Sequence, residues 1–195
     1  MRRIVLASNN PGKLREIAAL LAPLGIEVIP QSRLGIAEAE EPHESFLENA
    51  LAKARHASRA SSLPALADDS GLCVDALGGA PGVHSAYYAG REGSREERDA
   101  RNNAKLLASL GEARKAHYTC VMVLVRSADD WQPVVAKGTW HGEIARVPRG
   151  ENGFGYDPLF LLPERGVTAA ELAPEEKNRI SHRGRAAARL LAALR

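Results

Sequence analysis

The chain has 195 residues, of which 45% are hydrophobic and 26% are charged, and its formal net charge is +2. This length suffices for a large core, so we expect one domain over residues 1–195. The near-neutral balance, with no basic run, argues against a nucleic-acid binder. No apolar stretch approaches the length of a membrane span and no signal-peptide core is present, so we expect a cytoplasmic protein without a membrane partner. Cys73 and Cys120 are predicted to be buried free thiols of a reducing compartment.

A strand, a polar turn and a helix are predicted at the start of the chain. Residues 4–7 are a short apolar run typical of a strand buried on both faces, a helix follows up to Gly25, and residues 26–29 are a second strand. The turn between the first strand and the helix, residues 8–13, would receive the positive end of the helix and the charge of Lys13. It could therefore bind phosphate, although the Walker spacing is missing and an ordinary helix cap has the same composition.

An acidic stretch and a capped helix come next. Glu38, Glu40 and Glu41 could supply a metal ligand, although such a loop is usually only solvated. Ser45 and Glu48 fit a capping box for a helix that runs to about Ser61. The apolar face of this helix is predicted to comprise Phe46, Ala50, Ala54 and Ala57. Three polar residues beside that face are more typical of surface than of a site, namely Asn49, Lys53 and His56.

Two adjacent carboxylates, Asp68 and Asp69, stand between two apolar runs and precede Ser70 and Gly71. We expect a buried strand to end here in a turn. Open α/β sheets bind ligands at such strand ends, and carboxylates can hold a hard cation and accept a proton. A solvated turn is the alternative interpretation, because Asp, Ser and Gly are common turn residues.

The second half of the chain predicts further strands. Residues 78–82 form a loop, and Ser94 with Glu97 begins another boxed helix that ends near residues 110–111. Residues 117–125 and 134–140 are expected to pair as a hairpin that residues 142–145 extend. Parallel character at the start and antiparallel character later predict an α/β fold with a mixed central sheet flanked by helices.

Two segments near the C-terminus have unusual compositions. Phe154 stands between two glycines, so its ring is held on a backbone that other groups can approach, and it could stack on a nucleobase while Asp157 accepts from a base edge. The alternative is a tight turn before a buried strand over residues 158–162. One last helix is predicted from Pro174 towards Arg195, with Ser181, His182 and Arg183 in mid-helix.

The chain resembles the inosine/xanthosine triphosphate pyrophosphatase family along its whole length. The matching segments are residues 6–13, 45–50, 67–72, 79–82, 154–157 and 181–183. The resemblance implies an elongated sheet in two lobes with a nucleotide cleft between them. It also implies a homodimer that hydrolyses inosine, deoxyinosine and xanthosine triphosphates to monophosphate and pyrophosphate with Mg²⁺, which cleanses the nucleotide pool.

The resemblance assigns roles to individual residues. Asp69 resembles the catalytic proton acceptor, and Asp69 with Glu40 resembles the metal site, with Asp68 and Glu41 as neighbouring candidates. The triphosphate site would comprise Ser8, Asn9, Asn10, Pro11, Gly12, Lys13, Ser70 and Lys177. The base site would comprise Phe154, Gly155, Tyr156, Asp157, His182 and Arg183. As a hypothesis, Arg183 donates to the 6-oxo group of hypoxanthine or xanthine and leaves the 6-amino group of adenine mismatched.

One residue departs from the family pattern, and two alternative functions stay open. Tyr87 stands where many relatives have an arginine. A Maf-like nucleotide pyrophosphatase shares the opening turn but not the segments at residues 154–157 and 181–183. A non-catalytic nucleotide-binding regulatory module would have no need of the carboxylates Asp68, Asp69 and Glu40.

Overall fold

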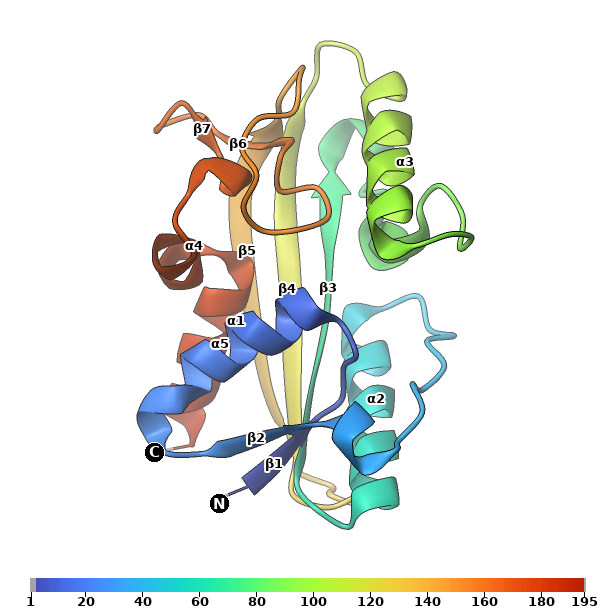
Figure 1. Cartoon of the computed structure of the whole chain (residues 1–195), viewed down its shortest axis with the longest axis vertical. Coiled ribbons are helices and arrows are strands. Elements are labelled where there is room, and N and C mark those ends of the chain that lie inside the picture. Colours follow the sequence, from blue (N-terminus) through green and yellow to red (C-terminus); the bar gives the residue numbers. More distant parts are fainter. Residues whose placement is uncertain (1–2, 195) are drawn as a thin grey trace. The chain divides into compact units, whose positions relative to one another are not determined.

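The computed structural model describes residues 3–194, which form two compact units (Figure 1). Unit 1 comprises the described part of Met1–Asp69, Cys120–Gly138 and His182–Arg195, and unit 2 comprises Ser70–Thr119 and Thr139–Ser181. The predicted domain of residues 1–195 stays a prediction, and residues 1, 2 and 195 lie outside the described part. Each unit is treated by itself below.

The described strands form a mixed sheet, as predicted. Their order is β2-β1-β3-β4-β5-β6-β7. β1 pairs in parallel with β2 and β3, whereas β6 pairs antiparallel with β5 and β7. The strand bounds are β1 Arg3–Leu6, β2 Glu27–Pro30, β3 Ala65–Val74, β4 Lys115–Val125, β5 Val134–Ile144, β6 Phe160–Leu162 and β7 Val167–Thr168. The residues of β3, β4 and β5 are divided between the two units.

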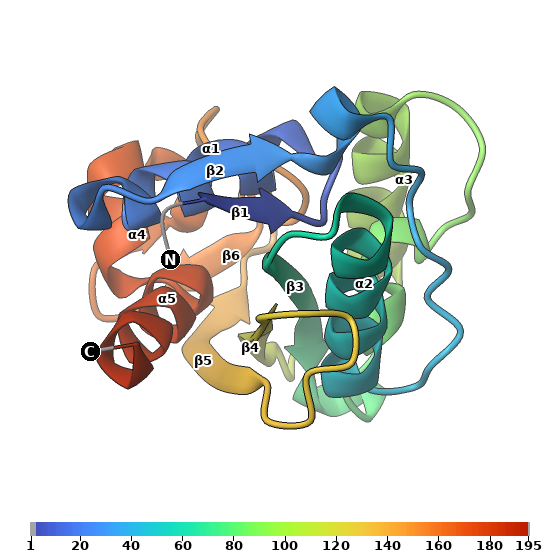
Figure 2. The same ribbon diagram turned by 90° about the horizontal axis from the view of Figure 1, so that it is seen from below.

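In unit 1, helices cover both faces of the strands. Because successive strand side chains point to opposite faces, Ile4 and Leu6 pack with α1 (Pro11–Leu21) and α5 (His182–Ala193). Val5 and Ala7 pack instead with α2 (Phe46–Ser61). Figure 2 shows α2 on one side of β3 and α5 on the other. The expected stripe of α2 is confirmed, since its alanines at 50, 54 and 57 are fully buried.

Unit 2 has its own apolar core. Tyr118, Trp140 and Phe160 form an aromatic group in which Phe160 lies 4.6 Å from Tyr118 and 5.0 Å from Trp140 between ring centroids. The helices of this unit are α3 (Arg95–Ala108), which packs Leu106 into that core, and α4 (Pro174–Ile180). Short 3-10 helices in the described chain span Ala22–Leu24, Gln31–Leu34, Asp75–Leu77, Gly82–Tyr87 and Ala169–Glu171.

The predicted helix starts at Ser45 and Ser94 are confirmed, and the capping box is complete at Ser94 but only half formed at Ser45. Asn10 caps α1, since its Oδ1 accepts from the N–H groups of Gly12 and Lys13 at 2.9 and 3.1 Å. Ser45 caps α2 by accepting from the N–H of Glu48. Ser94 and Glu97 form the complete capping box of α3.

The turn predicted at residues 68–71 is wrong. β3 continues without interruption through both carboxylates to Val74. Gly71 serves a close approach instead, because a Cβ there would lie 2.1 Å from the carbonyl oxygen of Gly82 and 2.5 Å from Ser85 Oγ. The adjacent Leu72 N–H donates to the same Ser85 Oγ at 2.9 Å.

The prediction of a single C-terminal helix is also wrong. Ser181 has an extended backbone, with φ −69° and ψ 166°, so α4 ends before it and α5 begins after it. His182 and Arg183 therefore occupy the first turn of α5 rather than mid-helix. In unit 1 their position is accommodated by Gly138, where a Cβ would lie only 2.0 Å from the carbonyl oxygen of His182.

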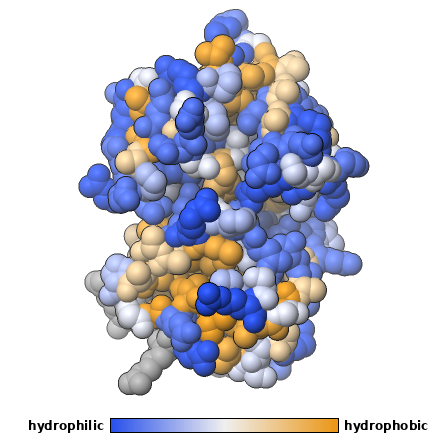
Figure 3. All heavy atoms as spheres, in the orientation of Figure 1, coloured by the Kyte–Doolittle hydropathy of each residue, from blue (hydrophilic) through white to orange (hydrophobic). Residues whose placement is uncertain are grey.

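Three further observations concern exposure. Apolar side chains gather over α1 in the view of Figure 3, where Ala18 and Ala19 are exposed and Leu14 and Leu20 are half-buried.

Both cysteines are free as predicted, but Cys73 is only half-buried. Among residues 3–194, none of the helices combines the length and apolarity needed to cross a bilayer.

Candidate active site

Strand alternation separates the two central carboxylates in unit 1. Asp68 follows Leu66 on the face of β3 that α1 and α5 cover, and Asp69 follows Ala67 on the face that α2 covers. Both side chains are buried. The two neighbours therefore have different partners although the chain places them side by side.

Asp68 is surrounded by cations. Lys13 Nζ of α1 lies 3.1 Å from Asp68 Oδ2, and Arg183 of α5 donates to the same oxygen from Nε at 3.3 Å and from Nη2 at 3.1 Å. Arg183 also pairs with Glu16 through Nη1. Burial raises the pKa of Asp68, but the charges of Lys13 and Arg183 outweigh burial and hold that pKa below its ordinary value. Asp68 is thus kept ionised by its surroundings.

Asp69 has the opposite electrostatics. Lys53 Nζ lies 3.1 Å from its Oδ1, and Asn49 Nδ2 donates to its Oδ2 at 3.4 Å. Burial raises the pKa of Asp69 above its ordinary value despite the neighbouring charge of Lys53. A carboxylate with a raised pKa holds a proton more readily, which suits a general base.

Asn49 and Lys53 join the candidate site, although their sequence pattern did not indicate it. The prediction that both belong to the surface is wrong, since Asn49 is buried and both contact Asp69. Burial alone would lower the pKa of Lys53. The negative charges of Asp69 and Glu41 together raise that pKa by more than burial lowers it, so the net shift is upward. The signal that could have found them is their spacing, because residues four apart share a helix face, here directly beside the alanine stripe.

The acidic loop places its neighbouring candidate, Glu41, in contact with the Asp69 cluster. Glu40 and Glu41 are both exposed, and Glu41 forms an ion pair with Lys53, so the assignment of Glu40 to the metal stays a prediction. Asp69 and Glu41 therefore converge on one cation, the ammonium of Lys53. No group of three or more His, Cys, Asp or Glu side chains that could hold a metal occurs among residues 3–194. Two carboxylates nevertheless fit Mg²⁺, which commonly binds one or two carboxylates and completes its shell with substrate phosphates and water.

The turn at residues 8–13 leaves few free amides. Gly12 and Lys13 donate to the Asn10 side chain, and the Leu14 N–H donates to the Asn10 carbonyl at 2.9 Å. The Asn10 N–H donates in turn to Ser8 Oγ at 3.2 Å, and Asn9 Oδ1 accepts from Gln31. Because the first helical amides are already used, the side chain of Lys13 is the stronger candidate for a phosphate contact, with Pro11 filling the first helical position.

The predicted base residues of unit 2 are brought together around Asp157. Asp157 Oδ2 accepts from the Phe154 N–H at 2.8 Å and pairs with Lys177 Nζ at 2.6 Å. Lys177 Nζ also lies 5.0 Å from the centroid of the Phe154 ring. Tyr156 is buried and donates through its hydroxyl to the Ser85 carbonyl at 2.8 Å, so it packs in the core of unit 2. Lys177, predicted to contact phosphate, is thus placed beside Phe154 and Asp157.

The remaining candidates are distributed between the units. Ser70 is half-buried on β3 and belongs to unit 2. His182 is buried in the first turn of α5. Arg183 is buried against Asp68 and Glu16, and its role as a donor to the base stays a prediction.

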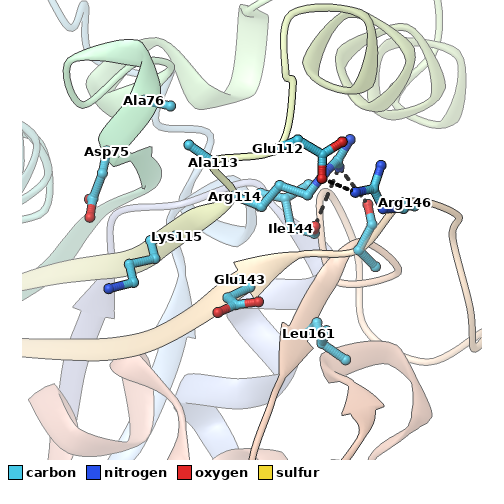
Figure 4. A pocket seen from close by; sticks show the side chains of 11 residues that line it. Asp75, Ala76, Glu112, Ala113, Arg114, Lys115, Glu143, Ile144, Arg146 and Leu161 are labelled. Carbon is cyan, nitrogen blue, oxygen red and sulfur yellow. Dashed lines mark hydrogen bonds and ion pairs between the residues drawn. The ribbon is translucent and has the colours of Figure 1, made fainter.

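Figure 4 shows a pocket of about 600 Å³ in unit 2 that contains none of the predicted site residues. Its wall carries both signs of charge, from Asp75, Glu112 and Glu143 and from Arg114, Lys115 and Arg146. Glu112 pairs with Arg146, and Arg114 donates to the Ile144 carbonyl. These internal contacts indicate a mixed surface rather than a site for one charged ligand.

Comparison with known proteins identifies the family. The profile of the Ham1 family matches residues 4–193. The chain belongs to the Ham1 family. A protein of Ralstonia nicotianae named dITP/XTP pyrophosphatase is 65% identical over all of this chain and 98% of its own length. One of the same name from Bordetella pertussis is 64% identical, over 100% and 92% of the two chains. The solved structure of a Ham1 protein from Coxiella burnetii has a TM-score of 0.90 and 48% identity, covering 100% of this chain and 98% of that one.

Proposed function

We propose that this Ham1-family chain hydrolyses non-canonical purine nucleoside triphosphates, namely deoxyinosine, inosine and xanthosine triphosphates, to the monophosphate and pyrophosphate. The activity in the names of its full-length relatives supports the reaction class. The observation that carries the proposal is the paired environment of Asp68 and Asp69, one held ionised among cations and the other with a raised pKa beside Lys53.

In this proposal, Asp69 accepts a proton from the attacking water. The water oxygen forms a bond to the α-phosphorus, and the bond to the bridging oxygen of the leaving pyrophosphate breaks. Lys13 and Lys53 offset the charge of the phosphates. Asn49 and Lys53 hold the two oxygens of Asp69 at 3.4 and 3.1 Å, which fixes the plane of its carboxylate. Phe154 supplies the ring on which the purine stacks.

A divalent metal is part of the proposal, and we assign it as Mg²⁺. Asp69 and Glu41 would hold it, because both carboxylates already contact one cation, the ammonium of Lys53. When bound, Mg²⁺ supplies charge neutralisation at the phosphate oxygens and polarises the attacked phosphorus. We further propose that the protein works as a homodimer in the cytoplasm, as its resemblance to pyrophosphatases of the nucleotide pool implies.

The test is product analysis with Mg²⁺, in which deoxyinosine and xanthosine triphosphates are compared with deoxyadenosine and deoxyguanosine triphosphates. We expect pyrophosphate from the first pair at rates well above those from the second pair. Asp69→Asn should lower kcat by about 10²–10⁴-fold, the range for loss of a general base. Asp129→Asn is the matched control, because that carboxylate is exposed and lies outside the cluster.

Three other results of the product analysis would each contradict a part of the proposal. Release of orthophosphate would contradict the pyrophosphatase assignment. Equal cleavage of deoxyadenosine triphosphate would contradict the base selectivity. Nucleotide binding without cleavage would favour the regulatory module instead.

A further inference from the structure

One face of α3 contacts the segment that carries Phe154. Arg95, Asp99 and Asn103 are spaced four apart, so they lie in one row on the helix. All three belong to unit 2, as does the Phe154 segment. We call these three residues the α3 row.

Each member of the α3 row contacts a different group of Phe154 and Gly155. Asp99 Oδ2 accepts from the Gly155 N–H at 3.0 Å, and Asn103 Nδ2 donates to the Gly155 carbonyl at 2.9 Å. The guanidinium carbon of Arg95 lies 5.0 Å from the centroid of the Phe154 ring, and Arg95 pairs with Asp99 at 3.8 Å. Both polar groups of one peptide residue and the neighbouring ring are thus held by one helix.

The backbone at this point needs such support. Gly155 has φ +64°, in the left-handed region, and a Cβ there would meet nothing within 4 Å. Its glycine is therefore required by backbone conformation rather than by crowding. A residue without a side chain has no packing of its own to hold it, so the bonds with Asp99 and Asn103 fix Gly155. Together with the bond from the Phe154 N–H to Asp157, they orient the Phe154 segment.

Two polar groups of the α3 row lie in partly buried surroundings that do not fully satisfy them. Burial raises the pKa of Asp99, so its carboxylate is held in a less favourable setting than water. Asn103 Oδ1 is buried and, within residues 3–194, makes no hydrogen bond. Buried polar groups are normally satisfied, and exceptions call for a reason. The reason that we assign is the pair of hydrogen bonds by which Asp99 and Asn103 hold Gly155.

We propose that Asp99 and Asn103 are positioning residues for the base site, and that Arg95 shapes the ring face of Phe154, so that the α3 row sets selectivity among purines. The inference rests on the proposed function, in which Phe154 stacks the base. None of the three residues need touch the reacting phosphates. The effect is therefore expected in KM and in discrimination rather than in kcat.

Substitutions that keep or remove each bond test the proposal. Asp99→Asn retains an acceptor for the Gly155 N–H, whereas Asp99→Ala does not. Asn103→Asp has nearly the same shape but places an acceptor against the Gly155 carbonyl. We expect Asp99→Ala, Asn103→Asp and Arg95→Ala to raise KM for deoxyinosine triphosphate about tenfold with kcat within about threefold, because a tenfold change matches one lost hydrogen bond of ordinary strength. Asp99→Asn should restore most of the wild-type KM.

Two measurements separate positioning from misfolding. The selectivity for deoxyinosine over deoxyadenosine triphosphate should fall about tenfold in the same variants, at unchanged circular dichroism. Glu96→Gln, an exposed position on the same helix, should change neither KM nor selectivity. If folded Asp99→Ala and Asn103→Asp keep the wild-type KM and selectivity, or if kcat alone falls, the positioning role is wrong. If the wild type itself releases no pyrophosphate from deoxyinosine triphosphate, it is the proposed function that fails.

Discussion

Asp68 is held by two side chains that arrive from opposite ends of the chain. Lys13 comes from the first helix and Arg183 from the last, and both contact the same Oδ2. Breaking a buried ion pair by removing one partner is costly, because the remaining charges stay buried without compensation. We therefore expect Asp68 to contribute to stability as well as to the candidate site.

Asp68→Asn tests this contribution. We expect a loss of about 3 kcal/mol in the free energy of unfolding at pH 7, at the lower end for a broken buried pair because Arg183 keeps Glu16. Urea titration of the metal-free protein measures it. Glu27→Gln, which removes an exposed pairing with Arg3, should cost below about 1 kcal/mol.

The difference in stability between wild type and Asp68→Asn should depend on pH. The folded pKa of Asp68 is depressed, so its stabilisation is present above the unfolded value of about 3.9 and is lost as the pH falls towards the folded value. The difference in stability between wild type and Asp68→Asn should therefore narrow below about pH 4. A difference that stays constant from pH 7 to pH 3 would contradict the charge argument.

At the scale of elements, α5 depends on a glycine of β5. A Cβ at Gly138 would lie 2.0 Å from the His182 carbonyl oxygen and 2.5 Å from the Ala186 nitrogen. Both are backbone atoms, so the helix rather than a flexible side chain would have to move. The start of α5 carries Arg183, and its displacement would reach Asp68.

Gly138→Ala should lower stability by about 1–3 kcal/mol, as overpacking does, and should also lower kcat/KM. Thermal unfolding and product release measure the two effects. Gly111→Ala is the matched control, because a Cβ there would meet nothing within 4 Å and its φ lies outside the left-handed region. If Gly138→Ala is as stable and as active as Gly111→Ala, the close packing of β5 against α5 at Gly138 is contradicted.

At the scale of the whole molecule, we expect the apolar cores rather than a metal to stabilise the fold. Each unit has a buried apolar cluster of its own, and the described residues contain no closed metal cage. A metal at Asp69 and Glu41 would then be completed by the substrate rather than by the protein. Metal removal should separate activity from stability.

Treatment with EDTA should stop pyrophosphate release and shift the melting temperature by less than about 2 °C, which corresponds to less than about 1 kcal/mol for a chain of this size. Added Mg²⁺ should restore activity. Differential scanning calorimetry with and without chelator makes the measurement. A drop of many degrees would instead indicate a structural metal.

The sequence by itself determined most of the local elements and the family. The caps at Asn10, Ser45 and Ser94 were predictable because a side-chain oxygen two or three residues before a backbone amide is a local signal. The first strand, predicted at residues 4–7 and observed at Arg3–Leu6, was predictable because its run is apolar on both faces. The order of short motifs was sufficient to place the chain among nucleotide pyrophosphatases.

Only the tertiary structure decided what the site residues contact. Asp68 and Asp69 are neighbours in sequence, yet strand alternation gives one to α1 and α5 and the other to α2, which shifts their pKa values in opposite directions. The spacing of Asn49 and Lys53 places them on one helix face beside the alanine stripe, but it does not reveal that Asp69 of β3 lies opposite that face. The glycine at 71 looked like a turn for the same reason, since the carbonyl that crowds it belongs to Gly82. Partners of this kind are brought together by packing between segments, which no local pattern encodes.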